Sequence, residues 1–301
     1  LNNLLFTFRI YFDFGGYGLT AYGIAHCMGI TLRMNFLSPY TACNIKEFWR
    51  RWHTSLTQWF TDYIYFTLGG SRTKRWALNM LIVFLISGLW HGAGWNFIIW
   101  GGLNGLGIIV YQFWKGMGWH LRFLLVSLVS AFTVMMCRLY PAPVWNLLAV
   151  WMLALWLGTL VRYIYHLCKG RGFVGLGYVW GVAQTFVFIT FTRLFFRSGS
   201  NLDPATANTE AWNTAKNMVQ QIGSKWNTAV IPDICSEYWK VFALVLIGMI
   251  IHWMPTRWKR WYRINFALLP LPIMVLAIVA VVFIIYQFVT ADVQAFIYFQ
   301  F

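Results

Sequence analysis

Apolar residues occur along this chain in long blocks separated by short polar or basic stretches. Residues 266–289 carry no charged side chain and are long enough to cross a hydrocarbon layer of about 30 Å as a helix. Residues 76–114 also lack Asp, Glu, Lys and Arg, but they are too long for one ordinary span. We therefore expect a bend where glycines gather, at residues 92–94 or at residues 101–107.

The same pattern predicts one or two membrane segments within residues 1–30. It predicts further segments at residues 76–90, 95–114, 121–137, 144–161, 173–193, 239–254 and 265–289. These segments predict an all-α, polytopic integral membrane protein in which residues 1–301 form a single membrane-embedded domain.

A different pattern separates the first apolar block from the later ones. Ser38 and Pro39 mark a loop over residues 35–41. Asn44, with Glu47 three residues later, predicts the start of a helix. Its body, residues 48–60, is both aromatic and basic, which is typical of a helix lying at the membrane interface or dipping into it. Residues 69–72 predict a turn after it.

Composition supports membrane insertion. Of the residues, 59% are hydrophobic and 10% are charged, and the mean hydropathy is +0.59, whereas soluble domains carry about 25% charged residues. The net charge of +15 does not indicate nucleic-acid binding, because the basic residues form short clusters between apolar blocks. The five cysteines show neither C-x-x-C nor metal-ligand spacing.

Lys and Arg in short loops predict the orientation of the spans. Two basic clusters mark cytoplasmic loops: Arg162, Lys169 and Arg171, then Arg257, Lys259, Arg260 and Arg263. Two predicted spans separate these loops, so we expect residues 197–240 on the outer side, together with the tail at 291–301.

His91 is the most informative candidate for chemistry. It lies in the run from Ser87 to Trp95 (SGLWHGAGW), far along the chain from any charged residue. An ionisable side chain at membrane depth is costly and points to function, and a dry pocket would hold the imidazole in its neutral, basic form. The alternative is a structural histidine hydrogen-bonded to a neighbouring helix, and the residues leave the two interpretations equally open.

Other candidates have stronger structural alternatives. His53 could be an interfacial side chain with a polar tip. Asp13, between two phenylalanines, must be paired or neutral, and it could orient a histidine or an arginine or serve in structural pairing. Arg50 and Arg51 could bind the phosphates of an acyl donor or touch lipid headgroups. Three further histidines lie near predicted span ends, where a side chain reaches toward the interface: His120, His166 and His252.

Common nucleotide and hydrolase motifs are absent from the sequence, including the P-loop, the dinucleotide fingerprint, H-E-x-x-H and G-x-S-x-G. A transporter or channel remains an alternative, since buried histidines and broken helices also serve proton relays and substrate sites. A scaffold that assembles partners in the membrane is a third reading.

The sequence contains four motifs in this order: YFDFGGY from Tyr11, FWRRWH from Phe48, LGGSR from Leu68 and GLWHGA from Gly88. Together they resemble the membrane-bound O-acyltransferase (MBOAT) family. Residues 194–197 and 296–301 show further likeness to it. The bacterial alginate O-acetyltransferase branch looks most similar, and the teichoic acid D-alanyl transferase is more distant. The likeness runs over nearly the whole chain. Family members are longer at the front, so we expect this chain to be the C-terminal part of a longer one.

The resemblance implies a bundle with broken or re-entrant helices around a central tunnel, in the bacterial inner (cytoplasmic) membrane. It implies that His91 is the catalytic histidine and His53 a second active-site histidine, and the predicted substrate-binding residues are Asp13, Arg50, Arg51, Trp90 and Trp95.

No bound cofactor or metal is expected. The co-substrate would be a cytoplasmic thioester, acyl-CoA or an acyl carrier protein, and the expected partners are membrane lipids, the acyl donor and a periplasmic acyltransferase, without nucleic acid. Departures at Gly15, Gly18 and Leu19, where the family often has serine or aspartate, leave the acceptor open.

Overall fold

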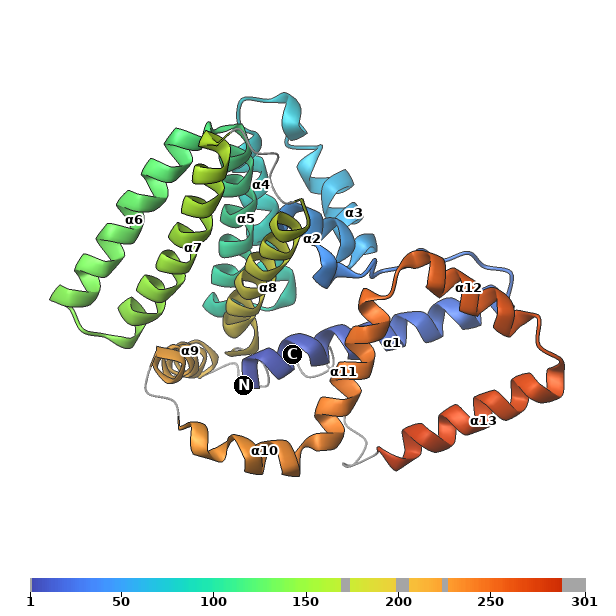
Figure 1. Cartoon of the computed structure of the whole chain (residues 1–301). Coiled ribbons are helices and arrows are strands. Elements are labelled where there is room, and N and C mark those ends of the chain that lie inside the picture. Colours follow the sequence, from blue (N-terminus) through green and yellow to red (C-terminus); the bar gives the residue numbers. More distant parts are fainter. Residues whose placement is uncertain (1, 169–173, 199–205, 224–226, 289–301) are drawn as a thin grey trace. The chain divides into compact units, whose positions relative to one another are not determined.

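A computed structural model describes residues 2–168, 174–198, 206–223 and 227–288 of the chain (Figure 1). Within these residues the regular structure is helical, apart from one isolated bridge between Phe36 and Trp52. The predicted all-α class is therefore confirmed. The chain forms two compact units, one within Leu1–Trp226 and one within Asn227–Phe299, and the expectation of a single domain stays a prediction.

The first unit contains nine α-helices within the described residues: α1 (Asn2–Cys27), α2 (Ile45–Arg51), α3 (Thr54–Phe60), α4 (Trp76–His91), α5 (Trp95–Gly116), α6 (Trp119–Leu139), α7 (Pro143–Leu167), α8 (Val174–Ser198) and α9 (Ala207–Gly223). Short turns lie between them, namely η1 (Pro39–Thr41), the π-helical turn η2 (Thr61–Tyr65) and η3 (Gly70–Arg72). The predicted loop at 35–41 and turn at 69–72 are confirmed.

Four helices of the described chain, α5 to α8, are long and apolar enough to cross a membrane. Helix α4 is apolar but shorter. Their bounds agree with the predicted segments within a few residues. The bend expected between residues 76 and 114 falls at Gly92–Gly94, where α4 ends and α5 begins, while residues 101–107 continue through α5. Where one or two membrane segments were predicted within residues 1–30, the structure has one helix, α1, which includes Arg9 and Asp13 and is not among the four helices apolar enough to cross a membrane.

Close backbone contact joins α4 to α5. An added Cβ on Gly88 would lie 2.3 Å from the Phe97 carbonyl oxygen, and one on Gly101 would lie 2.2 Å from the Phe84 carbonyl oxygen. Both distances are far below van der Waals contact, so these positions accept only glycine without a shift of one helix. The two glycines thereby let α4 and α5 approach closely, as small residues do in other membrane helix pairs.

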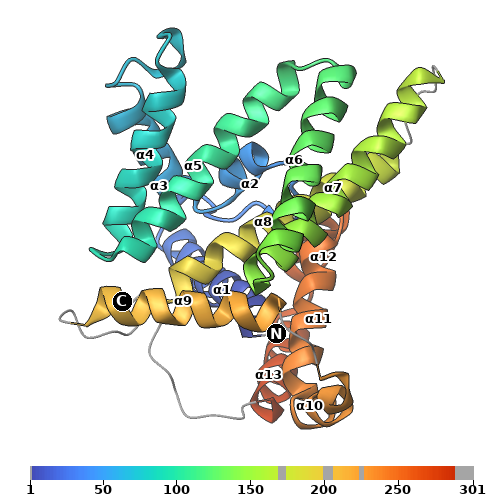
Figure 2. The ribbon, with the colours of Figure 1, turned by 90° about the vertical axis from the view of Figure 1, so that its left-hand side faces the viewer.

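Helices α6 and α7 form an antiparallel pair beside this one (Figure 2). The pair is joined by hydrogen bonds from the Ser130 hydroxyl to the Met152 carbonyl (3.0 Å) and from the Trp156 indole to the Ser127 hydroxyl (2.9 Å). Helix α8 packs against α5 and α1, and α9 runs across the ends of α7 and α8 (Figure 2). Helix α9 was not predicted from the sequence.

The second unit contains α10 (Ile231–Glu237), α11 (Trp239–Trp253), α12 (Thr256–Ala267) and α13 (Leu271–Gln287), after the short turn η4 (Thr228–Val230). Residues 228–237 and α11 meet at an angle of 83°, so together they form a broken apolar segment. Within this unit the Lys240 ammonium donates to the Gln287 carbonyl (3.1 Å), which ties the start of α11 to the end of α13.

Three sequence expectations for this unit need correction. The basic segment around residues 257–263 is helical, because its aromatic and basic residues recur at helical spacing and Pro255 and Pro270 bound it. His252, expected to reach toward the interface, is 3% exposed at the end of α11. The predicted span 265–289 is realised as the shorter α13, and residue 289 and the tail lie outside the described residues.

The contact between α4 and α5 makes a direct prediction for one glycine. Gly101→Ala should lower the free energy of unfolding by about 1–3 kcal/mol, because its methyl group meets the backbone of α4. The matched control is Gly102→Ala, the next residue of the same helix, whose Cβ would lie 3.6 Å from the Leu85 side chain in ordinary contact. Thermal unfolding midpoints in detergent measure the difference, and equal midpoints for the two variants would contradict the close contact.

Candidate active site

A break in the amphipathic segment positions His53. The sequence predicted one continuous helix over residues 48–60, which is wrong: α2 ends at Arg51, and α3 begins at Thr54. Between them His53 adopts a left-handed backbone conformation, with φ of 45° and ψ of 56°. This conformation is uncommon for a residue other than glycine and is held only where the surroundings determine it.

Hydrogen bonds from a distant loop cause this break. The Thr54 amide donates to the Asn35 carbonyl (3.0 Å) instead of continuing α2. The Ser55 hydroxyl and amide both donate to the Asn35 side-chain oxygen (2.6 and 3.2 Å). On the other side of His53, the Arg51 carbonyl accepts from the Leu37 amide (2.9 Å). The loop thus forms hydrogen bonds with backbone N–H and C=O groups that would pair with each other in an uninterrupted helix.

The imidazole of His53 is half-buried and packs against α1. Its ring meets the Phe14 ring edge to face, with centroids 4.7 Å apart. Its Nδ1 atom is buried and has no hydrogen-bond partner in the described residues. An orphaned buried polar atom is rare in a native protein and is commonly satisfied by water or a ligand.

His91 is the last residue of α4 and is surrounded by aromatic rings. Its ring centroid lies 5.2 Å from that of Trp100 on α5 and 5.0 Å from that of Phe196 on α8. Trp100 is 6% exposed and Phe196 is 2% exposed, and these two rings also contact each other. The imidazole at the end of α4 therefore packs against aromatic rings from α5 and α8. It lies where the chain breaks between α4 and α5.

The fold brings the two histidines near each other. His53 and His91 are 38 residues apart in the sequence, yet they lie close enough to interact electrostatically. Arg193, on α8, also interacts with His91 and lies over the Trp52 ring, with its guanidinium carbon 4.1 Å from the ring centroid.

Arg193 is a site residue that the sequence analysis missed. It falls on the last residue of the predicted span 173–193, where a basic side chain reads as an ordinary helix end. In the structure α8 continues to Ser198, and Arg193 is 5% exposed. The available signal was a lone cation inside an apolar block, which by itself points to function.

Three other predicted site residues, Asp13, Trp90 and Trp95, differ in their contacts and exposure. Asp13 precedes Phe14, the ring that packs on His53, and is half-buried on α1. The Trp90 ring contacts His91 (4.7 Å between centroids) and is 54% exposed. Trp95 is 65% exposed, and its amide donates to the Asn208 side chain of α9 (2.9 Å).

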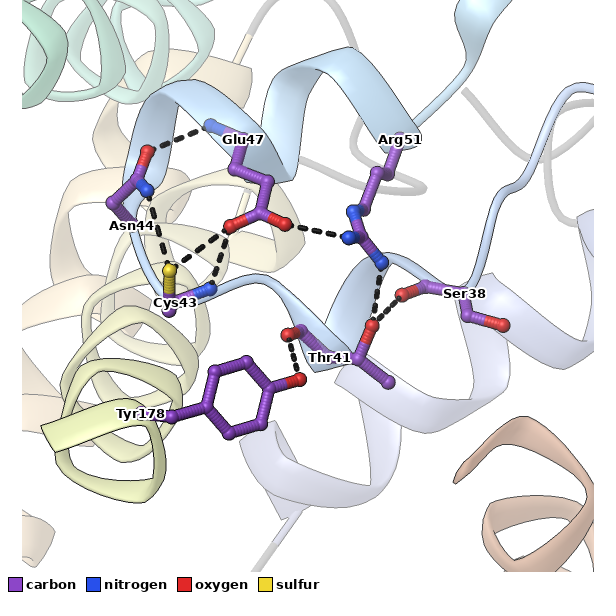
Figure 3. Close-up of polar contacts among 7 residues, drawn as sticks. All are labelled: Ser38, Thr41, Cys43, Asn44, Glu47, Arg51 and Tyr178. Atoms are coloured by element: carbon purple, nitrogen blue, oxygen red, sulfur yellow. Dashed lines mark hydrogen bonds and ion pairs between the residues drawn. The ribbon is translucent and has the colours of Figure 1, made fainter. Parts of the chain in front are cut away.

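Arg51 is held by local structure, as Figure 3 shows. Its guanidinium forms an ion pair with Glu47 one turn earlier and donates to the Thr41 hydroxyl (2.7 Å). Glu47 also accepts from the Cys43 amide (3.0 Å), and the Asn44 side chain accepts from the Glu47 amide (2.9 Å). The predicted start of the helix at Asn44 is confirmed, with the carboxylate reaching one residue further back than in a capping box.

Arg50, the residue before Arg51, is exposed. It interacts electrostatically with Lys46, which in turn interacts with Lys115 at the end of α5. These three residues form a basic cluster on α2 and at the last turn of α5. Burial lowers the pKa of Lys46, and its two cationic neighbours lower it further.

The arrangement provides one enclosed imidazole, a second imidazole with an orphaned nitrogen, and a buried cation. Such a set can accept a proton and stabilise developing negative charge. Among the residues that the structure describes, no three His, Cys, Asp or Glu side chains group in a way that could hold a metal ion. The fold and these residues define a polytopic membrane protein in which two half-buried histidines lie near each other, one of them at the end of a helix that breaks before the next span.

Comparison with known families agrees with this class. Residues 1–118 match the family model described as "MBOAT, membrane-bound O-acyltransferase family". The matched region contains both histidines, and the resemblance inferred from the motifs is confirmed there. The likeness noted at residues 194–197 and in the tail lies outside this match, and the tail also lies outside the described residues.

Three relatives illustrate the likeness. The peptidoglycan O-acetyltransferase of Helicobacter pylori is 48% identical over 114 residues, covering 37% of this chain and 22% of that protein. The probable alginate O-acetylase AlgI of Azotobacter vinelandii is 47% identical over 107 residues, covering 35% and 21%. The teichoic acid D-alanyltransferase of Bacillus subtilis is 36% identical over 128 residues, covering 38% and 32%. The chain thus spans about a fifth of the length of the first two relatives.

The network around Glu47 makes a prediction about stability. Burial raises the pKa of the Glu47 carboxyl, but the hydrogen bonds from Cys43 and the Arg51 guanidinium outweigh it and hold the pKa below its usual value. The ionised carboxylate therefore stabilises the fold above the unfolded-state pKa, and this stability is lost as pH falls through the folded-state pKa. Glu47→Gln should lower the free energy of unfolding by about 1 kcal/mol at neutral pH.

Unfolding midpoints measured against pH check this. The difference between Glu47→Gln and the unchanged protein should shrink as pH falls, because protonation removes the same charge. The control is Asp62→Asn, on an exposed Gln58–Asp62 hydrogen bond, which should leave the neutral-pH midpoint unchanged. A Glu47→Gln difference that stays constant to low pH would contradict the role of the charge.

Proposed function

We propose that this protein is a membrane-bound O-acyltransferase, which moves an acyl group, in our view acetyl, from a cytoplasmic thioester toward hydroxyl groups outside the cytoplasm. The single observation that carries the proposal is His91, the last residue of α4, whose imidazole packs against Trp100 and Phe196 and lies near His53. The match of residues 1–118 to the acyltransferase family supports it.

In the proposed reaction His91 acts as the general base. Its neutral imidazole accepts the proton of the acceptor hydroxyl while the hydroxyl oxygen attacks the thioester carbonyl carbon. Thioesters are already reactive, so positioning and base catalysis suffice without an acyl-enzyme intermediate. His53 orients the acceptor, and its orphaned Nδ1 is the group available for that hydrogen bond.

The basic cluster of Lys46, Arg50 and Lys115 supports a donor site on the cytoplasmic face. Lys115 lies at the same end of the helix bundle as Arg122 and Arg162: the Lys115 carbonyl accepts from Arg122 (3.1 Å), which interacts with Arg162 across α6 and α7. Arg162, in the last part of α7, belongs to the basic cluster expected on the cytoplasmic side. Coenzyme A and acyl carrier proteins both carry phosphates, which such a cluster would bind.

The acceptor we propose is an exported polysaccharide or a periplasmic acyltransferase that passes the acyl group onward. The names of the relatives, which specify peptidoglycan and alginate O-acetylation, support a cell-envelope polymer. We place the protein in the bacterial inner membrane, with the acyl group passing through a tunnel that reaches His91 from both faces.

Replacing the general base tests the proposal. His91→Gln keeps a polar side chain of similar size, and it should lower kcat by at least about 100-fold because no group accepts the hydroxyl proton. The control is His120→Gln, at a histidine bonded to the Tyr163 hydroxyl at the start of α6. Release of the free thiol from acetyl-CoA by the purified complete protein, with alginate or peptidoglycan fragments as acceptors, measures the rate. Near-normal turnover in a folded His91→Gln variant would overturn the assignment.

The competing class is a transporter or channel, in which His91 would relay protons or line a substrate site. The same purified protein in liposomes separates the two readings. Acyl transfer without flux supports the enzyme, flux without transfer supports the transporter, and neither activity supports a scaffold.

The donor site makes a separate prediction for Arg50. Arg50→Ala should raise KM for acetyl-CoA about five-fold, the effect of losing one exposed charge contact of about 1 kcal/mol. KM for S-acetyl-N-acetylcysteamine, a thioester without phosphates, should stay unchanged. The control is Arg138→Ala, at an exposed arginine at the opposite end of α6. Equal changes for both donors would contradict a phosphate contact.

A further inference from the structure

Arg193 is the buried cation of the site, and the proposed reaction as described so far does not use it. A guanidinium stays protonated in proteins, so burying it at 5% exposure on an apolar helix is costly. Its stacking over Trp52 at 4.1 Å recovers a part of that cost. A cation held within an apolar helix points to function.

The position of Arg193 on α8 directs it to the reaction centre. Arg193 and Phe196 are three residues apart and share one face of the helix, and Phe196 packs directly on the His91 ring. Trp52, beneath the guanidinium, precedes His53 in the sequence. Arg193 also interacts electrostatically with His91 and with the buried Tyr40. The cation therefore lies between the two histidine-bearing segments.

We propose that Arg193 is a further catalytic residue, whose guanidinium stabilises the negative charge that develops on the thioester carbonyl oxygen during acyl transfer. This inference rests on the proposed function and adds to the proton-accepting His91 a group that stabilises the developing negative charge. A fixed cation in a water-poor pocket is effective in this role, because no solvent reorganises during the reaction.

The steps balance as follows. The acceptor hydroxyl gives its proton to His91, and its oxygen forms a bond to the carbonyl carbon. The carbonyl π electrons move to the oxygen, which becomes the anion that Arg193 stabilises. These electrons then return to re-form the carbonyl, the carbon–sulfur bond breaks, and the leaving thiolate takes the proton from the His91 imidazolium. The products are an ester and a free thiol.

Two variants of similar length separate charge from packing. Arg193→Lys and Arg193→Met both lose the planar stack over Trp52, but only lysine retains the positive charge. Arg193→Met should lower kcat about 100-fold with KM for acetyl-CoA nearly unchanged, the size of effect seen when one oxyanion-stabilising group is removed. Arg193→Lys should retain a substantial part of kcat at a similar unfolding midpoint.

Chemical rescue gives a second readout. In Arg193→Ala, added methylguanidinium at millimolar concentration should restore part of kcat, whereas urea, of similar shape but uncharged, should not. The control is Arg138→Ala, which removes an exposed guanidinium at the end of α6 opposite to the basic cluster, and its turnover should equal that of the unchanged protein.

The outcomes separate the two proposals. If His91→Gln is inactive while Arg193→Met keeps kcat within about three-fold, the proposed function stands and the role of Arg193 is overturned. Equal kcat in the lysine and methionine variants also overturns it, because the charge is then irrelevant. If the unchanged protein transfers no acetyl group from acetyl-CoA or a loaded acyl carrier protein, the proposed function fails and this inference fails with it.

Discussion

The pairing of residues 34–37 with the backbone on both sides of His53 is the interaction on which the candidate site depends. Asn35 takes hydrogen bonds from Thr54 and Ser55, and Leu37 donates to the Arg51 carbonyl. An uninterrupted helix would satisfy these groups internally and would carry His53 on a regular face. Because the loop satisfies them instead, the backbone turns at His53 and the imidazole packs against Phe14.

The rest of the site follows from what an apolar environment permits. Helices α5 to α8 satisfy their own backbone groups, so they can cross a bilayer, and close glycine contacts bring α4 against α5. At the junction of α4 and α5 the chain is broken by Gly92–Gly94, and His91 ends the first helix. Aromatic rings from α5 and α8 therefore pack around the His91 imidazole at the end of α4. In such apolar surroundings a fixed charge such as that of Arg193 interacts more strongly than it would in water.

Much of the helical framework was predictable, and the candidate site was predictable in part. The spans around α4 to α8 and α11 followed from apolar blocks, because lipid imposes length and apolarity on any helix that crosses it. His91 stood out because an ionisable residue within an uncharged block of 39 residues, 76–114, is rare. Helices α9 and α12 were missed, since both carry polar residues and are not marked by hydropathy. Arg193 was missed because the predicted span ended on it.

The sequence by itself determined the membrane class, the order of the spans and the start of α2 at Asn44. It also singled out His91 as the main candidate for chemistry. All of these depend on composition and local spacing. Only the tertiary structure decided that α2 and α3 are separate helices, that His53 lies near His91, and that Arg193 lies over Trp52 and near His91. Each of these facts depends on contacts between segments far apart in the chain, and helical periodicity carries no information about which loop will take a helix's hydrogen bonds.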